Sequence, residues 1–264
     1  MNKVFSSRRS FVKNTAGSLG LLTLPSLLHS QSAIKSQEKK KIVVVGGHPD
    51  DPECGCGGTA AQLTTRGHEV TFMYFTTGEE GIEGKTWEEA ATIRKKECIE
   101  ACKVLHTKPL FVGQIDGESV LGNPEMAKFE QLLYAEKPDI VFAHWPVDSH
   151  KDHQLSSVLT IQSWMETSQR FVLYFYEVCT GYQSFLFNPT DYVDISDYEE
   201  QKMKALACHA SQDIVVNGKY TQNMIDCGHP AMQDFRGREL GVRAAEAFIR
   251  FTGKGFGTVR EFAI

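Results

Sequence analysis

The chain has 264 residues, of which 41% are hydrophobic and 23% are charged. At roughly 100–200 residues per domain this length suits one large domain or two small ones, and the apolar content excludes a disordered chain. The formal charge is −5, and outside the N-terminus no run of basic residues could neutralise a row of phosphates. We therefore expect no nucleic-acid partner. No stretch of about 20 uninterrupted apolar residues occurs, so we expect no stable membrane span.

The first 36 residues have the layout of a targeting segment. Arg8 and Arg9 lie in the order Ser-Arg-Arg-x-Phe-x-Lys, and an apolar stretch of small residues follows at 16–28. This arrangement is typical of a secretory signal, and the arginine pair resembles the twin-arginine type, which exports folded proteins. The alternative is an amphipathic N-terminal helix. We expect residues 1–36 to be a twin-arginine-type signal peptide and linker, and the protein to be periplasmic or otherwise exported.

Strand and helix patterns alternate along residues 37–264. The β-branched run at 42–45 is typical of a strand buried on both faces. The predicted strands lie at 42–45, 69–75, 110–112, 139–143, 172–176 and 192–195. The predicted helices lie at 58–66, 86–105, 124–136, 153–168, 197–209 and 237–251. This order predicts an α/β fold with a Rossmann-like, mostly parallel sheet, helices on both faces and a single domain.

The seven cysteines are an odd number, which argues against a complete disulfide framework. Cys54 and Cys56 resemble half of a metal clip, but the chain offers no matching second pair. We expect the cysteines to be packing residues in a chain that folds in the reducing cytoplasm before export.

Two polar segments follow predicted strands, where an open α/β sheet binds its ligands. The first, Gly-Gly-His-Pro-Asp-Asp-Pro-Glu at 46–53, places three carboxylates within four residues. Their charge would repel the phosphate that a glycine-rich turn binds at this place, and it would attract a cation. A polar β-turn is the structural alternative, because Pro-Asp-Asp is favourable in turns. The adjacent His48 favours a metal site.

The second segment runs from 144 to 153 and contains three histidines and two aspartates. His150 and His153 are three residues apart, so they share a face where a helix begins. A single histidine here would be a capping or core residue, but five candidate ligands opposite the first acidic cluster favour a metal site. Imidazole and carboxylate ligands without a set of thiolates suit Zn²⁺, with Fe²⁺ or Mn²⁺ as alternatives, better than Ca²⁺ or Mg²⁺.

These motifs resemble those of the PIG-L/LmbE-like N-acetylglucosaminyl deacetylases. The similarity rests on His-Pro-Asp-Asp at 48–51, Gly-Gly-Thr at 57–59 and His-x-Asp-His at 150–153. It extends to Arg-x-x-Glu at 94–97 and His-x-Ser-Gln at 209–212, and it spans about 41–251. The resemblance implies that residues 37–264 form a zinc-dependent domain that hydrolyses the acetamide of an N-acetylated amino sugar, or a related amide.

Carried over by position, the family's metal ligands would be His48, Asp51 and His153. Asp50 would be the general base for a metal-bound water, and in an extended turn it would point away from its neighbour Asp51. His150 would polarise the carbonyl and stabilise the oxyanion.

Three further residues have roles implied by the resemblance. Asp152 would orient a histidine and fix its tautomer. Arg94 would either pair with an acid such as Glu53 or bind sugar hydroxyls. Asp116 would bind sugar hydroxyls, or it would be an ordinary turn aspartate before a glycine. Pro52 departs from the family, in which many members have Asp-Asp-Glu without a break; this puts the role of Glu53 in doubt and leaves the metal ligands unaffected.

The expected activity is therefore zinc-dependent removal of the acetyl group from a GlcNAc-type sugar or glycoconjugate. The expected partner is this small-molecule substrate, and the sequence leaves a homo-oligomer open. Two alternatives remain at this point. One is an amidase that releases a larger acyl group from an amino-sugar conjugate, and the other is an exported sugar-binding protein without turnover. Loss of Asp50 or His150 would favour the second alternative, and the sequence retains both.

Overall fold

The computed structural model describes residues 38–167, 171–222 and 229–252. The expected signal segment at 1–36 lies outside the described residues. No helix in the described part of the chain is both long enough and apolar enough to span a bilayer.

A seven-stranded sheet forms the centre of the fold, in the order β3-β2-β1-β4-β5-β9-β6. The first five of these strands are mutually parallel, and β9 is antiparallel to both of its neighbours. The strands are β1 (Lys41–Gly46), β2 (Glu69–Thr76), β3 (Lys108–Gln114), β4 (Ile140–His144), β5 (Val172–Tyr176), β6 (Asp191–Asp194) and β9 (Ala245–Arg250). The expectation of an α/β fold with a mostly parallel sheet is confirmed.

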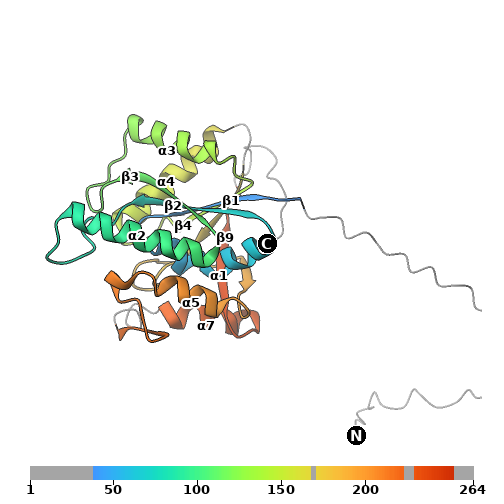
Figure 1. Cartoon of the computed structure of the whole chain (residues 1–264). Helices are drawn as coiled ribbons and strands as arrows, with labels where there is room; N and C mark the ends of the chain where they lie inside the picture. The colour runs from blue at the N-terminus through green and yellow to red at the C-terminus, as the bar shows by residue number, and fades with distance from the viewer. Residues whose placement is uncertain (1–37, 168–170, 223–228, 253–264) are drawn as a thin grey trace, which may run out of the picture. The chain divides into compact units, whose positions relative to one another are not determined.

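Helices cover both faces of the sheet (Figure 1). The side chains of β1 alternate between two apolar cores, with Ile42 and Val44 in one and Val43 and Val45 in the other. The first core includes α1 (Asp51–Thr65), α2 (Trp87–Leu105) and α5 (Glu199–Leu206). The second includes α3 (Asn123–Ala135) and α4 (Lys151–Glu166). This double burial explains why β1 consists almost entirely of β-branched residues.

Two predicted helices, at 237–251 and 58–66, differ from the structure. The predicted final helix at 237–251 is wrong, because α7 (His229–Leu240) ends before Gly241, whose φ is +84°, and β9 follows. In β9 the residues from Ala245 to Phe248 are buried without a gap, so the apolar run that suggests a helix is a strand covered on both faces. The shorter elements are a 3-10 turn (Ala210–Gln212) and a hairpin formed by β7 (Val215–Val216) and β8 (Lys219–Tyr220).

Helix α1 begins at Asp51, seven residues before the predicted start at Gly58. Its glycines lower helix propensity, but they allow close packing that overrides propensity. A Cβ atom on Gly58 would lie 2.7 Å from Cβ of Ile195, and one on Gly55 would overlap the ring of Tyr176. Pro52 fits in the first turn, where its missing N–H is not needed. The expected extended turn at Asp50 and Asp51 is therefore wrong.

The six cysteines that the structure describes are free thiols, and five of them are buried. Cys54 and Cys56 lie on α1 within the first core, and burial holds the pKa of each thiol well above its usual range. Cys227 lies outside the described residues. The described cysteines thus fit the expected packing role.

Candidate metal centre

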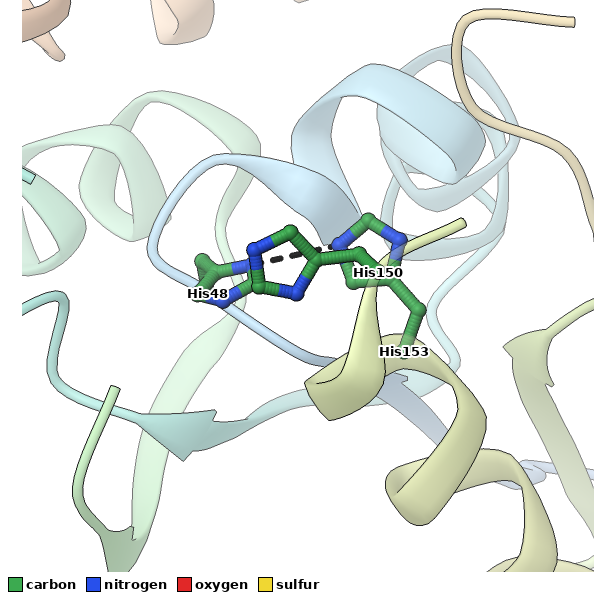
Figure 2. A group of neighbouring side chains, drawn as sticks. All are labelled: His48, His150 and His153. Carbon is green, nitrogen blue, oxygen red and sulfur yellow. Dashed lines mark hydrogen bonds between the residues drawn. The ribbon is translucent and has the colours of Figure 1, made fainter. Parts of the chain in front are cut away.

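The two polar segments of the sequence lie side by side at the carboxyl ends of β1 and β4. These strands are parallel neighbours, and α1 and α4, the helices that follow them, cover opposite faces of the sheet. A crevice opens where neighbouring strands send their helices to opposite faces, and ligands bind there. His48 follows β1, and His150 and His153 lie at the start of α4. Figure 2 shows the three imidazole rings in contact. They can meet because β1 and β4 are parallel neighbours that end at the same edge of the sheet.

Three potential ligand atoms form a nearly equilateral triangle. His48 Nδ1 lies 3.1 Å from His153 Nε2 and 3.2 Å from Asp51 Oδ2, and the last two atoms are 3.2 Å apart. For zinc bonds of about 2.0–2.1 Å, tetrahedral ligands are separated by about 3.3 Å. The residues named from sequence as metal ligands are thus brought together with the spacing that this geometry requires.

Each of the two histidines has its other ring nitrogen held by a carboxylate. His153 Nδ1 lies 3.1 Å from Asp148 Oδ1, and His48 Nε2 lies 3.1 Å from Asp152 Oδ2 and 3.2 Å from Asp116 Oδ1. A ring N–H donated to a carboxylate leaves the opposite nitrogen free to bind a metal, and this pairing is typical of zinc sites. Asp152 therefore lies where it can fix the tautomer of His48. Sequence reasoning counted Asp148 among five candidate ligands but gave it no specific role.

The electrostatics of this cluster favour a cation. Burial opposes protonation of both histidines, yet the surrounding carboxylates raise the pKa of His48 well above its usual range and that of His153 to about 9. Burial also opposes ionisation of Asp51, but the His153 and His144 imidazoles together outweigh it, and the pKa of Asp51 lies well below its usual range. Two imidazoles and one carboxylate, with a further position open to a pocket, are a known ligand set of catalytic zinc.

Other groups of neighbouring side chains also have the composition of a metal site. One consists of His48, His150 and His153, which Figure 2 shows. His48 and His150 form a second with Asp116 and Asp152, and His144 forms a third with Asp51 and His153. His144 Nε2 accepts a hydrogen bond from the Gly47 N–H at 2.9 Å, so it is already occupied. The chemistry and spacing fit best for His48, Asp51 and His153.

Asp50 lies beside Asp51 but points elsewhere. Its carboxylate accepts a hydrogen bond from Arg94 Nη2 at 2.8 Å, and its side chain lines the pocket. The Asp50 backbone has a φ of 106°, which separates the two side chains at the helix start. Burial raises the pKa of Asp50 to about 6, although Arg94 acts in the opposite direction. An ionised carboxylate in this state is a stronger base than an exposed one.

Arg94 pairs with Asp50 and not with Glu53, the acid named from sequence. It also donates to the Pro49 carbonyl, and it lines the pocket. The loop after β2 wraps around its guanidinium group, and a Cβ atom on Gly78 would lie 2.6 Å from Arg94 Nη1. The Gly-Glu-Glu-Gly segment at 78–81, which sequence reasoning passed over, is thus needed for the arginine to lie against the site.

Glu53 belongs to a separate buried group behind the pocket. It accepts a hydrogen bond from Tyr74 at 2.7 Å, and His209 Nε2 lies 3.2 Å away. Burial lowers the pKa of His209, but Glu53 outweighs this effect and the net shift is upward. Nothing in the sequence showed that these three distant residues would meet.

His150 caps the N-terminus of α4 and lies at the pocket. Its Nδ1 accepts the Asp152 backbone N–H at 3.3 Å, so the neutral ring carries its proton on Nε2. Burial lowers the pKa of His150, and His48 and His153 act in the same direction. A neutral imidazole with one N–H is suited to donate a hydrogen bond to an oxygen that gains negative charge.

A pocket of about 340 Å³ lies over these residues. Asp50, Asp116 and His150 line it, together with Glu80, Gln183 and Gln212. The Arg-x-x-Glu and His-x-Ser-Gln motifs meet beside it, because the Glu97 carboxylate accepts hydrogen bonds from both the backbone N–H and the hydroxyl of Ser211, each at 2.7 Å.

The chain is similar to known deacetylases. The model of the GlcNAc-PI de-N-acetylase (PIG-L) family matches residues 43–164, which contain both polar segments. The probable N-acetyl-alpha-D-glucosaminyl L-malate deacetylase 2 of Bacillus cereus is 29% identical over 185 residues, covering 66% of this chain and 84% of its own. The diacetylchitobiose deacetylase of Thermococcus kodakarensis is 27% identical, covering 80% and 83%.

The fold is also similar to that of solved structures. The N,N'-diacetylchitobiose deacetylase from Pyrococcus horikoshii superposes with a TM-score of 0.70 at 27% identity, covering 84% of this chain and 87% of its own.

Asp148 provides a test of the metal centre that leaves all three ligands intact. Asp148→Asn removes the negative charge behind His153, and we expect zinc affinity to fall by about 10- to 100-fold. A competition titration against a chelating dye measures this. Asp197→Asn, an exposed aspartate outside the site, is the control. An unchanged dissociation constant in Asp148→Asn would exclude the proposed support of His153.

Proposed function

This chain belongs to the PIG-L/LmbE-like family of GlcNAc-PI de-N-acetylases, and on that basis we propose that it is a zinc-dependent hydrolase that removes the acetyl group from an N-acetylated amino sugar. The observation that carries the proposal is the triangle of His48 Nδ1, Asp51 Oδ2 and His153 Nε2 at the base of the pocket. Fe²⁺ and Mn²⁺ suit the same ligand set.

Bound zinc would supply a Lewis acid and would lower the pKa of water to about 7, giving a nucleophile at neutral pH. Asp50 accepts the proton of the attacking water. Its location beside a ligand but turned toward Arg94, and its pKa of about 6, suit that role. The Nε2–H of His150 donates to the carbonyl oxygen as negative charge develops there. Cleavage of the C–N bond gives acetate, and the proton held by Asp50, or that on His150, passes to the leaving amine.

Arg94 and Asp116 bind the sugar in this proposal, but each also supports the chemistry. Arg94 holds the Asp50 carboxylate, and Asp116 contacts His48 Nε2. Both residues line the pocket, so a sugar hydroxyl can reach them. Substrate binding and orientation of the catalytic groups would therefore depend on the same side chains.

Export through the twin-arginine signal is part of the same proposal. Arg8 and Arg9 support it, and a substrate outside the cytoplasm would follow.

The activity is tested by adding the zinc-loaded protein to a panel of N-acetylated amino sugars and measuring free amine, with mass spectrometry of the released acid. We expect acetate and an equivalent amount of amine. Release of a larger acid from acylated conjugates, with no acetate from any N-acetyl sugar, would favour the amidase alternative. Sugar binding without release of any acid would favour the binding protein.

The adjacent aspartates separate base from ligand. Asp50→Asn nearly preserves shape and should keep the metal, while kcat falls by roughly 10²–10⁴, the usual contribution of general acid–base catalysis, and KM changes little. Asp51→Asn, the matched variant, should weaken zinc binding. Zinc content by atomic emission and steady-state kinetics measure both effects. If Asp50→Asn loses zinc while Asp51→Asn retains both zinc and turnover, the two roles are assigned the wrong way round.

A further inference from the structure

Gln212 is a polar residue of the pocket to which the proposed mechanism gives no role. It is the last residue of the His-x-Ser-Gln motif at 209–212 and belongs to the 3-10 turn Ala210–Gln212. This turn is far along the chain from both polar segments, yet Gln212 lines the same pocket. Its side-chain amide has one atom that donates and one that accepts hydrogen bonds, so the orientation of the amide decides what it offers to a substrate.

Two neighbours fix the orientation of the Gln212 amide. Nε2 lies 2.8 Å from the carbonyl oxygen of Gly81 and 3.1 Å from the hydroxyl oxygen of Ser211. A carbonyl oxygen can only accept a hydrogen bond, so the atom that faces Gly81 must be the nitrogen. The Ser211 hydroxyl donates its own hydrogen to Glu97, so it too accepts from Gln212. A flipped amide would set its oxygen against the Gly81 carbonyl oxygen with no hydrogen between them.

This orientation leaves Oε1 as the free polar atom of the Gln212 side chain. Both hydrogens of Nε2 are used, and within the described part of the chain no group donates to Oε1. Oε1 is also absent from the buried polar atoms without a partner among the described residues, so it is accessible. Because Gln212 lines the pocket, a bound molecule can reach this oxygen. The side chain therefore presents a hydrogen-bond acceptor in a fixed position.

The loop after β2 holds Gln212 together with the two residues proposed to bind the sugar. The Gly81 carbonyl of this loop accepts from Gln212, and a Cβ atom on Gly81 would overlap the guanidinium group of Arg94. Further back in the loop, the Glu79 carboxylate accepts the backbone N–H of Asp116 at 3.0 Å. One loop thus links three pocket residues that can each meet a different part of one sugar ring.

We propose that Gln212 is a specificity-determining residue, whose Oε1 accepts a hydrogen bond from one hydroxyl group of the amino sugar. This inference rests on the proposed deacetylase function and adds a residue to the recognition of its substrate. The acetamide must reach the metal ligands, whereas the hydrogen bonds of Gln212 tie it to the loop that encloses Arg94. Its donor is therefore a hydroxyl group and not the acetamide N–H. A sugar that lacks this hydroxyl leaves the acceptor unpaired and is a poorer substrate.

The test combines variants of the zinc-loaded full chain with deoxy analogues of its substrate. The N-acetyl sugar that is hydrolysed best in the panel described above is compared with its 3-deoxy, 4-deoxy and 6-deoxy analogues. For one of these analogues, Gln212→Met should abolish a preference for the parent sugar that the wild-type protein shows. We expect this preference in kcat/KM to be roughly 3- to 10-fold, the contribution of one neutral hydrogen bond. The variant loses that factor on the parent sugar alone, and the ratios for the other two analogues stay as in the wild type.

Gln212→Ala is a second variant and should give the same ratios as Gln212→Met. A folding defect lowers all four values of kcat/KM together and leaves the ratios unchanged. Gln201→Leu is the matched control, because Gln201 Nε2 also donates to a backbone carbonyl, that of Val104 at 2.7 Å, from a position on α5 outside the pocket. It should leave both the rates and the ratios unchanged.

Two results would overturn the inference and leave the deacetylase function intact. One is a common loss of kcat/KM on the parent sugar and on all three analogues in both Gln212 variants, which would show that Gln212 only supports the loop. The other is no change on any of the four sugars. Failure of the wild-type protein to hydrolyse any N-acetyl sugar would overturn the proposed function together with the inference.

Discussion

The arrangement of β1 and β4 is the constraint on which the rest of the site depends. The strands pair in parallel through Ile42–Ile140, Val43–Val141 and Val44–Phe142, so they end at the same edge of the sheet. Their helices leave toward opposite faces, which opens the crevice and places the start of α1 opposite the start of α4. Helix α1 brings the candidate ligand Asp51 into the gap and α4 brings His153. His48 completes the triangle from the turn after β1.

Burying so many ionisable groups is costly unless each has a partner. Asp51, Asp148 and Asp152 are almost wholly buried, and each contacts a histidine. The network is continued by backbone and hydroxyl donors in the loops after β3 and β5. Fixed carboxylates behind the histidines make a site that attracts a divalent cation. The same two loops also supply Asp116 and Gln183 to the lining of the pocket.

Much of the fold and the two polar segments follow from local sequence pattern, whereas the roles of single residues were implied by the resemblance to a known family. Runs of β-branched residues predict the buried strands, and the polar clusters lie in the turns that follow them. The sequence pattern gave wrong elements where packing between distant parts of the chain determines the secondary structure. The glycines of α1 argue against a helix in the sequence, but the structure needs them because Tyr176 and Ile195 pack closely against that helix. The apolar run in β9 has no periodicity that would distinguish a buried strand from a helix.

Side-chain partners were harder to predict than strand positions. Arg94 was expected to meet an acid or a sugar, and which acid it meets depends on the unusual backbone of Asp50. The signal for Asp148 was present in its own segment, two residues before His150, but its role depends on the geometry of the α4 N-terminus. Glu53 contacts His209, which is more than 150 positions away, and no local sequence pattern predicts this contact.

The location of the metal is the most direct test of this account. Crystals of the zinc-loaded protein, measured at energies on both sides of the zinc absorption edge, give an anomalous map that identifies the ion and its ligands without reference to activity. We predict one strong peak that contacts His48 through Nδ1, His153 through Nε2 and Asp51 through Oδ2, with Asp50 outside the coordination sphere. A peak held by His48 Nε2 together with Asp116, His150 and Asp152, the alternative group on the other side of the His48 ring, would contradict it.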